Sequence, residues 1–377
     1  VWVIDMAHRQ SWHRSLSDAS AGLSAATIAS LTVASTESVQ KGDRLYMVGG
    51  YGQQAGGATG TLNTLTAVNL PGMMAWAMGG SGTAAPFVRQ TSNPALAVTG
   101  GALLDLDGRM QLVFGQNFQG GYTPGKTGVY TQQIRSFDLV DNGVTLSATN
   151  FAATTPSASY RRRDLNVVPV IRPDGAGGLA SAAVALAGVF TPDDGGWTVP
   201  VEIDQFGTPT MADPLAATTF KQGFNGYESA NVGLYSEAAG TMHELLLGGI
   251  SLQSLDPATG VIRTDAAFPF VNDLTAVSID ANGEYAQRHL GYFPEILDQS
   301  GKALRFGANA EFFVDEAIPT FDNGVIKLDQ LQGATRLGYV FGGIASNSPN
   351  TRGVAGAVSG ASNLVFEVVL VPVPEPA

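Results

Sequence analysis

Apolar runs that end in small residues recur along the chain. Each run is rich in β-branched and other apolar residues and is short for a helix, so it predicts a buried strand. The first three steps from one run to the next are about 60 to 75 residues long, which suits a four-stranded propeller blade with loop insertions. The runs are Arg44–Gly50, Met110–Gly115, Val184–Phe190, His243–Gly249 and Leu337–Gly343.

Further strand signals flank these runs. Leu103–Arg109 and Val170–Gly175 each place a strand and an Asp-Gly turn before a run, which is typical of a hairpin. After several runs comes an alternating strand that ends in Asp or Asn, whose side chain can bond its own backbone in a turn. These strands are Thr64–Asn69, Gln133–Asp138, Val199–Asp204 and Thr275–Asp280. The pattern predicts an all-β chain folded as a β-propeller.

The number of blades depends on one weak copy of the run, Lys302–Gly307. Counting it gives six blades, which we favour, and leaving it out gives five. The β-prone segment Asn363–Val373 is expected to pair with Val1–Asp5 and so to close the propeller. We therefore expect one domain over residues 1–371, followed by a tail at 372–377.

Helix signals are nearly absent. The best candidate, Ser15–Ser30, is rich in Ala and Ser but contains glycine and lacks a 3.6-residue period, which predicts a loop with one short turn. Stretches rich in Ser, Thr and Gly predict surface loops inside the domain, because the repeat resumes after them. They are 52–61, 79–91 and 345–362.

Composition narrows the class of protein. Of 377 residues, 44% are hydrophobic and 14% are charged, which indicates a globular chain and excludes a disordered one. The net charge of −12 argues against nucleic-acid binding. Cysteine is absent, so disulfides, thiolate metal sites and a cysteine nucleophile are excluded. No stretch reaches the roughly 18 consecutive apolar residues that a membrane span needs.

The repeat resembles the kelch repeat. The shared features are Gly-Gly after an apolar strand, then an alternating strand ending in Asp, then an aromatic residue such as Trp12 or Trp197. More closely, the chain is similar to a group of uncharacterised exported bacterial kelch-like proteins, a resemblance that implies fold and export but no activity. The segments that carry it are Arg9–Trp12, Gly42–Gly52, Arg162–Asp164, Met242–His243, Gly307–Phe312 and Asp322–Asp329.

The two ends of the chain also favour export. Val371–Ala377 is similar to the start of a PEP-CTERM sorting signal, although the apolar segment and arginine cluster of that pattern are absent; a plain proline-rich tail is the alternative. The chain starts at Val1 without methionine, as expected after removal of a targeting segment. We expect a secreted or cell-surface bacterial protein.

Three consecutive arginines stand out in a chain poor in positive charge. If Arg162 and Arg163 face the central funnel of the propeller, their guanidinium groups can bind carboxylates of acidic sugars or peptides. In the alternative, Asp164 pairs with one arginine and the others cover the outer surface. Arg9, Arg135 and Glu311 are secondary candidates for the same funnel, as the resemblance implies.

The histidines and carboxylates of the sequence give only weak evidence for a metal-binding site. His8 and His13 lack zinc-ligand spacing, and His243 is a candidate ligand-binding residue, although a hydrogen-bonded structural histidine is the favoured interpretation. Three short segments match part of a calcium loop but are first of all hairpin turns. They are Asp105-x-Asp107-Gly108, Asp193-Asp194-Gly195 and Asp280-x-Asn282-Gly283. We predict no cofactor and leave calcium open.

No motif separates an enzyme from a binding protein. The leading hypothesis is a non-enzymatic exported propeller whose loops bind extracellular polysaccharide or protein, including copies of itself. The alternative is a glycoside hydrolase or lyase that uses residues such as Arg162, Asp164 or Glu311 in the funnel. A filament subunit that donates its final strand to a neighbour is a third hypothesis.

Overall fold

The computed structural model describes residues 1–122, 126, 128–256 and 258–371. The chain divides into two compact units, Val1–Arg163 and Asp164–Ala377, and each is described by itself. Whether the two behave as the one domain expected over 1–371 stays a prediction. The expected tail at 372–377 lies outside the described residues.

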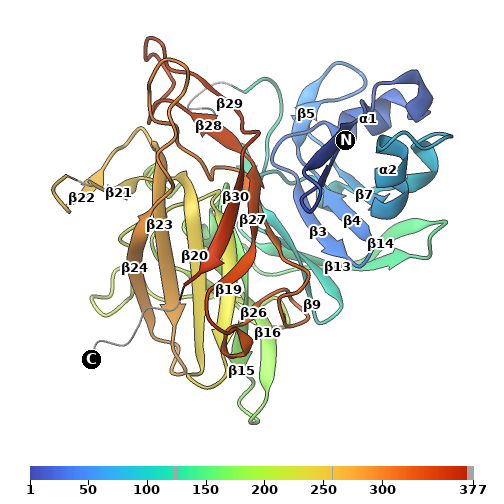
Figure 1. Ribbon diagram of the computed structural model, residues 1–377. Helices are drawn as coiled ribbons and strands as arrows, with labels where there is room; N and C mark the ends of the chain where they lie inside the picture. The colour runs from blue at the N-terminus through green and yellow to red at the C-terminus, as the bar shows by residue number, and fades with distance from the viewer. Residues whose placement is uncertain (123–125, 127, 257, 372–377) are drawn as a thin grey trace. The chain divides into compact units, whose positions relative to one another are not determined.

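The first unit contains two four-stranded antiparallel sheets that share one core. The order of the strands is β3-β4-β7-β8 in one sheet and β9-β10-β13-β14 in the other (Figure 1). Val48, Leu65, Met110 and Phe137 are fully buried in the shared cluster. The strands are β3 (Glu37–Lys41), β4 (Arg44–Val48), β7 (Thr64–Asn69), β8 (Val88–Ser92), β9 (Ala102–Leu106), β10 (Arg109–Val113), β13 (Ile134–Asp141) and β14 (Leu146–Ala153).

Shorter elements complete the first unit. Three hairpins are formed by β1 (Trp2–Asp5) with β2 (Gln10–His13), β5 (Tyr51–Gln53) with β6 (Thr59–Thr61), and β11 (Gln116–Asn117) with β12 (Val129–Tyr130). The helices are α1 (Ala25–Leu31) and α2 (Leu70–Ala77), with short 3-10 turns η1 (Ala19–Ala21), η2 (Ala85–Phe87), η3 (Pro94–Leu96) and η4 (Ala158–Tyr160).

Both α-helices correct the sequence prediction. The region predicted as a loop with one turn contains α1, whose first turn is capped by Ser24 accepting a hydrogen bond from the Thr27 amide. Asn69 ends β7 as expected, but its side chain accepts from the Gly72 amide and so starts α2 instead of a turn. Gly72 and the short length of α2 removed any periodic signal, although the helix buries its own Trp76.

The second unit contains three larger sheets. Their strand orders are β15-β16-β17-β18, β24-β23-β20-β19-β26 and β25-β27-β30. The strands are β15 (Asn166–Pro173), β16 (Leu179–Leu186), β17 (Val201–Ile203), β18 (Pro209–Met211), β19 (Ala230–Ser236), β20 (Thr241–Ile250), β23 (Phe270–Ile279), β24 (Tyr285–Tyr292), β25 (Ala310–Val314), β26 (Ile326–Lys327), β27 (Thr335–Gly342) and β30 (Val365–Leu370).

Two clusters form the core of this unit. One joins β15 and β16 to β19, β20 and β23 through residues such as Val170, Val184, Leu246 and Val277. The other joins β19 to β25, β27 and β30. Two hairpins and a 3-10 turn lie outside these sheets: β21 (Gln253–Leu255) with β22 (Ile262–Thr264), β28 (Ile344–Ser346) with β29 (Ser359–Ala361), and η5 (Leu328–Gln330).

The chain is therefore all-β and propeller-like, with five blade sheets, two in the first unit and three in the second. Each of the five apolar runs begins on the strand that comes second in chain order within its blade sheet, namely β4, β10, β16, β20 and β27. The preferred count of six is not confirmed. Lys302–Gly307 forms only isolated bridges, Leu297 with Ala303 and Arg305 with Ser346, so it connects strands and builds no blade of its own.

The expected pairing of the two ends is wrong. In β1, Val3 pairs with Trp12 of β2, while in β30 Phe366 pairs with Val340 of β27. Arg9 has a φ of 53°, which lets the chain reverse at once after β1 and form a local hairpin. Part of the predicted loops is also strand, because 52–61 contains most of β5 and β6, 79–91 contains the start of β8, and 345–362 contains β29.

The recurring glycines are explained by a close approach of two backbones. The Gly50 amide donates to the Val98 carbonyl at 2.9 Å, and the Gly249 amide donates to the Phe306 carbonyl at 3.2 Å. The glycine before each donor leaves no room for a side chain, because a Cβ on Gly49 would lie 2.0 Å from the Val98 oxygen. Only glycine fits there, so the Gly-Gly pair ends the strand and fixes the next segment.

Helices of the described residues include none that is long and apolar enough to cross a membrane.

We expect Gly248→Ala to destabilise the protein by about 3 kcal/mol, because it combines a left-handed φ with a backbone clash. Gly248 has a φ of 67°, and its Cβ would lie 2.2 Å from the Phe306 oxygen. Gly283→Ala is the control, since φ is 82° and nothing lies within 4 Å; we expect a cost of about 1 kcal/mol. Urea unfolding measures the stability of both variants, and an equal loss of unfolding free energy in the two would contradict the steric explanation.

A candidate binding pocket on the β15–β18 sheet

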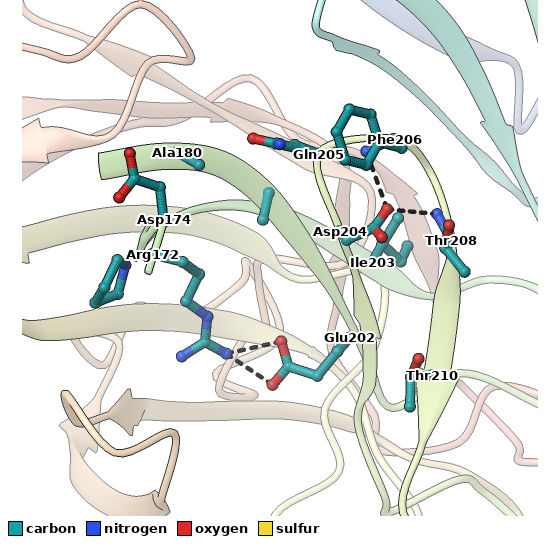
Figure 2. A pocket seen from close by; sticks show the side chains of 12 residues that line it. Arg172, Asp174, Ala180, Glu202, Ile203, Asp204, Gln205, Phe206, Thr208 and Thr210 are labelled. Carbon is teal, nitrogen blue, oxygen red and sulfur yellow. Dashed lines mark hydrogen bonds and ion pairs between the residues drawn. The ribbon is translucent and has the colours of Figure 1, made fainter. Parts of the chain in front are cut away.

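A pocket of about 310 Å³ lies on the third blade sheet of the chain, within the second unit. Its walls come from the β15–β16 end and from the β17–β18 hairpin (Figure 2). The volume is at the lower end of the range for small-molecule sites, which is about 300 to 1,000 Å³. The lining residues are Arg172, Pro173, Asp174, Ala180, Ala182, Glu202, Ile203, Asp204, Gln205, Phe206, Thr208 and Thr210.

An ion pair crosses the strands that carry the pocket. Nη2 of Arg172 donates to both carboxylate oxygens of Glu202 at 2.7 Å, as Figure 2 shows. The Tyr285 hydroxyl on β24 also donates to Glu202, and burial is the main cause that raises the pKa of Tyr285. Phe220 stacks on the Tyr285 ring with centroids 5.2 Å apart. These contacts hold Arg172 and Glu202 in fixed positions, which reduces the entropy lost when a ligand binds.

Two further carboxylates stand at turns of the pocket. Oδ1 of Asp174 accepts from the amides of Ala176 and Gly178, both at 2.8 Å, and these bonds lower its pKa. Oδ1 of Asp204 accepts from the amides of Phe206 and Thr208 at 2.9 and 2.8 Å. Within the described part of the chain, Oδ2 of each carboxylate has no hydrogen-bond partner, so each can accept from a ligand.

Phe206 is the one aromatic residue among the described residues that line the pocket. It sits in the tight turn between β17 and β18, and 67% of its surface is exposed. An exposed aromatic ring in the same pocket as fixed carboxylates offers a flat apolar face together with hydrogen-bond acceptors. Such a combination is typical of a site for a polyhydroxylated ligand, because one side of a sugar ring is apolar and its hydroxyl groups are donors.

The pocket is less suited to glycoside hydrolysis. That reaction needs a carboxylic acid whose raised pKa keeps it protonated. Asp174 shows the opposite direction, because backbone amides stabilise its charged form and lower its pKa. Glu202 is already occupied by Arg172 and Tyr285. The arrangement therefore favours binding over acid catalysis.

The segments that match part of a calcium loop are built as turns. Asp107 and Gly108 have φ values of 51° and 76° in the β9–β10 hairpin, and Asp280 accepts from the Asn282 amide at 2.8 Å in the β23–β24 turn. The Thr191 hydroxyl donates to Asp193 at 2.6 Å. Among the residues described, no group of three or more His, Asp or Glu side chains is placed to hold a metal ion. Calcium binding stays an open prediction.

The predicted arginines of the first unit lie in separate places. Arg9 is exposed in the β1–β2 turn. Arg135 on β13 donates to the Ala95 carbonyl at 2.9 Å, and burial lowers its pKa. Neither residue lines the pocket, and their roles in ligand binding stay predictions.

The arginine run lies next to the boundary between the units. Arg162 is fully buried, and burial lowers its pKa to about 9. Nε of Arg163 donates to the Tyr130 hydroxyl at 3.1 Å, and the Arg161 guanidinium lies 4.2 Å from the centre of the same ring. Asp164 begins the second unit with a φ of 50°. The proposed recognition of ligand carboxylates by this run stays a prediction.

The remaining two candidates belong to strands of the second unit. Nδ1 of His243 is 2.8 Å from the Ser278 hydroxyl on the neighbouring strand, and burial, followed by the charge of Arg288, lowers the pKa of His243. This contact fits the favoured structural interpretation. Glu311 on β25 is accessible to solvent, yet partial removal of water by surrounding protein raises its pKa. Neither lines the pocket on β15–β18.

Sequence reasoning missed Arg172, Glu202 and Phe206. The two segments that form the pocket, Val170–Gly175 and Val199–Asp204, were recognised only as strand and turn. One available signal was Phe206 itself, a large aromatic residue between Gln205 and Gly207 in a tight turn, where polar residues are usual. The ion pair had no local signal, because Arg172 and Glu202 are brought together by the sheet.

Comparisons with known proteins were made on the sequence and on the structure. A scan of protein-family models found no match, and a search of curated proteins also found none. A solved structure, that of YjhT, aligns with 88% of this chain and 84% of its own chain, at 12% identity and a TM-score of 0.43. We infer no function from so distant a similarity, and the fold rests on the sheets described above.

We expect Tyr285→Phe to cost about 1 kcal/mol of stability, because Glu202 loses a hydrogen bond to its charged form. The ring and its packing on Phe220 are kept. Tyr292→Phe on the same strand is the matched control, as its ring is partly exposed. Thermal unfolding of both variants measures the difference, and equal stability of the two would contradict the role given to the Tyr285 hydroxyl.

Proposed function

We propose that this protein is an exported propeller that binds extracellular polysaccharide, and that the pocket on the β15–β18 sheet is its site. The single observation that carries this proposal is that one pocket is lined by both an exposed Phe206 ring and the carboxylates of Asp174 and Asp204. A sugar ring packs its C–H face on the aromatic ring while its hydroxyl groups donate to the carboxylate oxygens.

Charge favours a neutral polysaccharide over an acidic one at this pocket. The chain carries a net charge of −12, and the only cation lining the pocket among the described residues, Arg172, is paired with Glu202. An acidic sugar would meet Asp174 and Asp204 as like charges, which disfavours binding. A neutral sugar offers hydroxyl donors to the same oxygens without this repulsion.

Export and family membership are further parts of the proposal. The resemblance to exported kelch-like proteins and the PEP-CTERM-like residues at the end support a secreted or cell-surface location, and the lack of cysteine agrees with either. Fractionation of the native host, with an antibody against this chain, tests the location. Recovery of the protein only in the cytosolic fraction would contradict it.

We expect Phe206→Ala to weaken binding to a neutral polysaccharide at least about 10-fold, equivalent to 1.4 kcal/mol, while leaving the melting temperature unchanged. The ring is largely exposed, so its removal affects the ligand more than the fold. Leu215→Ala is the control, because Leu215 is 90% exposed and does not line the pocket. A glycan array identifies the ligand, and calorimetry with it measures affinity.

Two results would contradict the proposal. Equal affinity of the Phe206→Ala and Leu215→Ala variants would place binding elsewhere. Release of shortened sugar products from the bound polysaccharide would show that the protein is the glycoside hydrolase or lyase of the alternative hypothesis.

A further inference from the structure

Glu244 is a fully buried carboxyl in an apolar core. It lies in the middle of β20, between Met242 and Leu246 on the same face of the strand, and 0% of its surface is exposed. Met242 and Leu246 belong to the cluster between the β15–β16 strands and β20. Among the described residues, neither oxygen of Glu244 has a hydrogen-bond partner. A buried polar group without a partner costs free energy and calls for an explanation.

The space for this carboxyl comes from a glycine on the next strand. Glu244 pairs with Gly233 of β19, and a Cβ on Gly233 would lie 3.0 Å from Oε1 of Glu244. The same Cβ would lie 3.4 Å from Val325. The carboxyl therefore lies directly over a position where β19 has no side chain.

A cavity of about 220 Å³ adjoins the same glycine. Its lining includes Gly233 and Val325, together with Pro169, Asn231, Phe312 and Val314. Gly233 therefore lines the cavity and also lies opposite Glu244, and it has no side chain that could stand between the two.

The cluster that surrounds Glu244 is apolar apart from two tyrosines, and the charged pair of Arg172 and Glu202 reaches it only at the Tyr285 hydroxyl. The titratable members of the cluster are Tyr235 on β19 and Tyr285 on β24, and burial raises the pKa of both, which keeps them neutral. The other strands and the segment before β26 contribute these apolar side chains to the cluster: Val168, Val170, Ile171, Ala182, Val184, Leu186, Val277, Ile279, Phe321 and Val325. Burial alone raises the pKa of Glu244 well above its usual value.

We propose that Glu244 is a proton-dependent latch: its protonated form keeps the core between β15–β16 and β19–β20 closed, and its ionisation admits water from the cavity past Gly233. The device depends on the carboxyl, the gap at Gly233 and the cavity together. It is independent of the polysaccharide site proposed above.

The sign of the pH dependence follows from linkage. The folded state binds the Glu244 proton more tightly than the unfolded state, so stability falls as the pH rises from the unfolded pKa through the folded pKa. At a pH below both pKa values, Glu244 is protonated in the folded and the unfolded state, and the free-energy cost of a buried charge vanishes. Glutamine has the shape of the protonated acid and never ionises.

Glu244→Gln should therefore raise the melting temperature by about 2 to 4 °C or more at pH 9 and leave it nearly unchanged at pH 4, relative to wild type. Glu295→Gln, at an exposed glutamate of the same unit, is the control and should give no pH-dependent difference. A Glu244→Gln shift that is the same at all pH values would overturn the proposal.

Two direct measurements test the latch itself. At neutral pH the infrared spectrum of wild type minus Glu244→Gln should contain the C=O stretch of a protonated carboxylic acid; a carboxylate band there would overturn the proposal. Hydrogen exchange of the β19 and β20 amides should accelerate with rising pH in wild type relative to Glu244→Gln measured at the same pH. Equal protection of the two proteins at high pH would also overturn it.

Discussion

The fold of this chain depends on backbone carbonyls that lie against glycines at the ends of the second blade strands. Gly49 and Gly248 take positive φ values and leave the Val98 and Phe306 oxygens where a Cβ would otherwise be. The next amide along the chain donates to the same oxygen, so one contact ends a strand and fixes the segment that leads to the next sheet. This double requirement explains the Gly-Gly pairs at the ends of β4 and β20.

The same sheets position both the pocket and the buried carboxyl. Ala182 on β16 belongs to the core cluster and also lines the pocket, and Tyr285 packs on that cluster while its hydroxyl contacts Glu202. The pocket is therefore held by a packed sheet, although Phe206 itself stands in an exposed turn. A rigid support with an exposed aromatic tip is a common arrangement for binding surfaces, since the scaffold limits the entropy lost on binding.

Period-two patterning and glycine spacing were sufficient to predict an all-β, propeller-like chain and many of its strands, because both are local properties, but they did not give the number of blade sheets. The strand Thr64–Asn69 was predicted with its observed bounds, and all five runs lie on strands. Pairings between segments far apart in the chain could not be predicted from local patterns. Nothing local shows that Lys302–Gly307 bridges to distant segments, or that β30 pairs with β27 and not with β1. The pocket residues could not be predicted from the sequence for the same reason, since Arg172 and Glu202 meet only through strand pairing. In the sequence, Glu244 is one more polar position in a strand, and only the structure places Gly233 opposite it.

The central functional claim is that Phe206 and the two turn carboxylates form a sugar site. A crystal structure of the protein soaked with the oligosaccharide that it binds best tests this most directly. The account predicts a sugar ring stacked on Phe206, with hydroxyl groups within hydrogen-bond distance of Asp174 or Asp204. An oligosaccharide bound at another surface, with the pocket on β15–β18 empty, would contradict it.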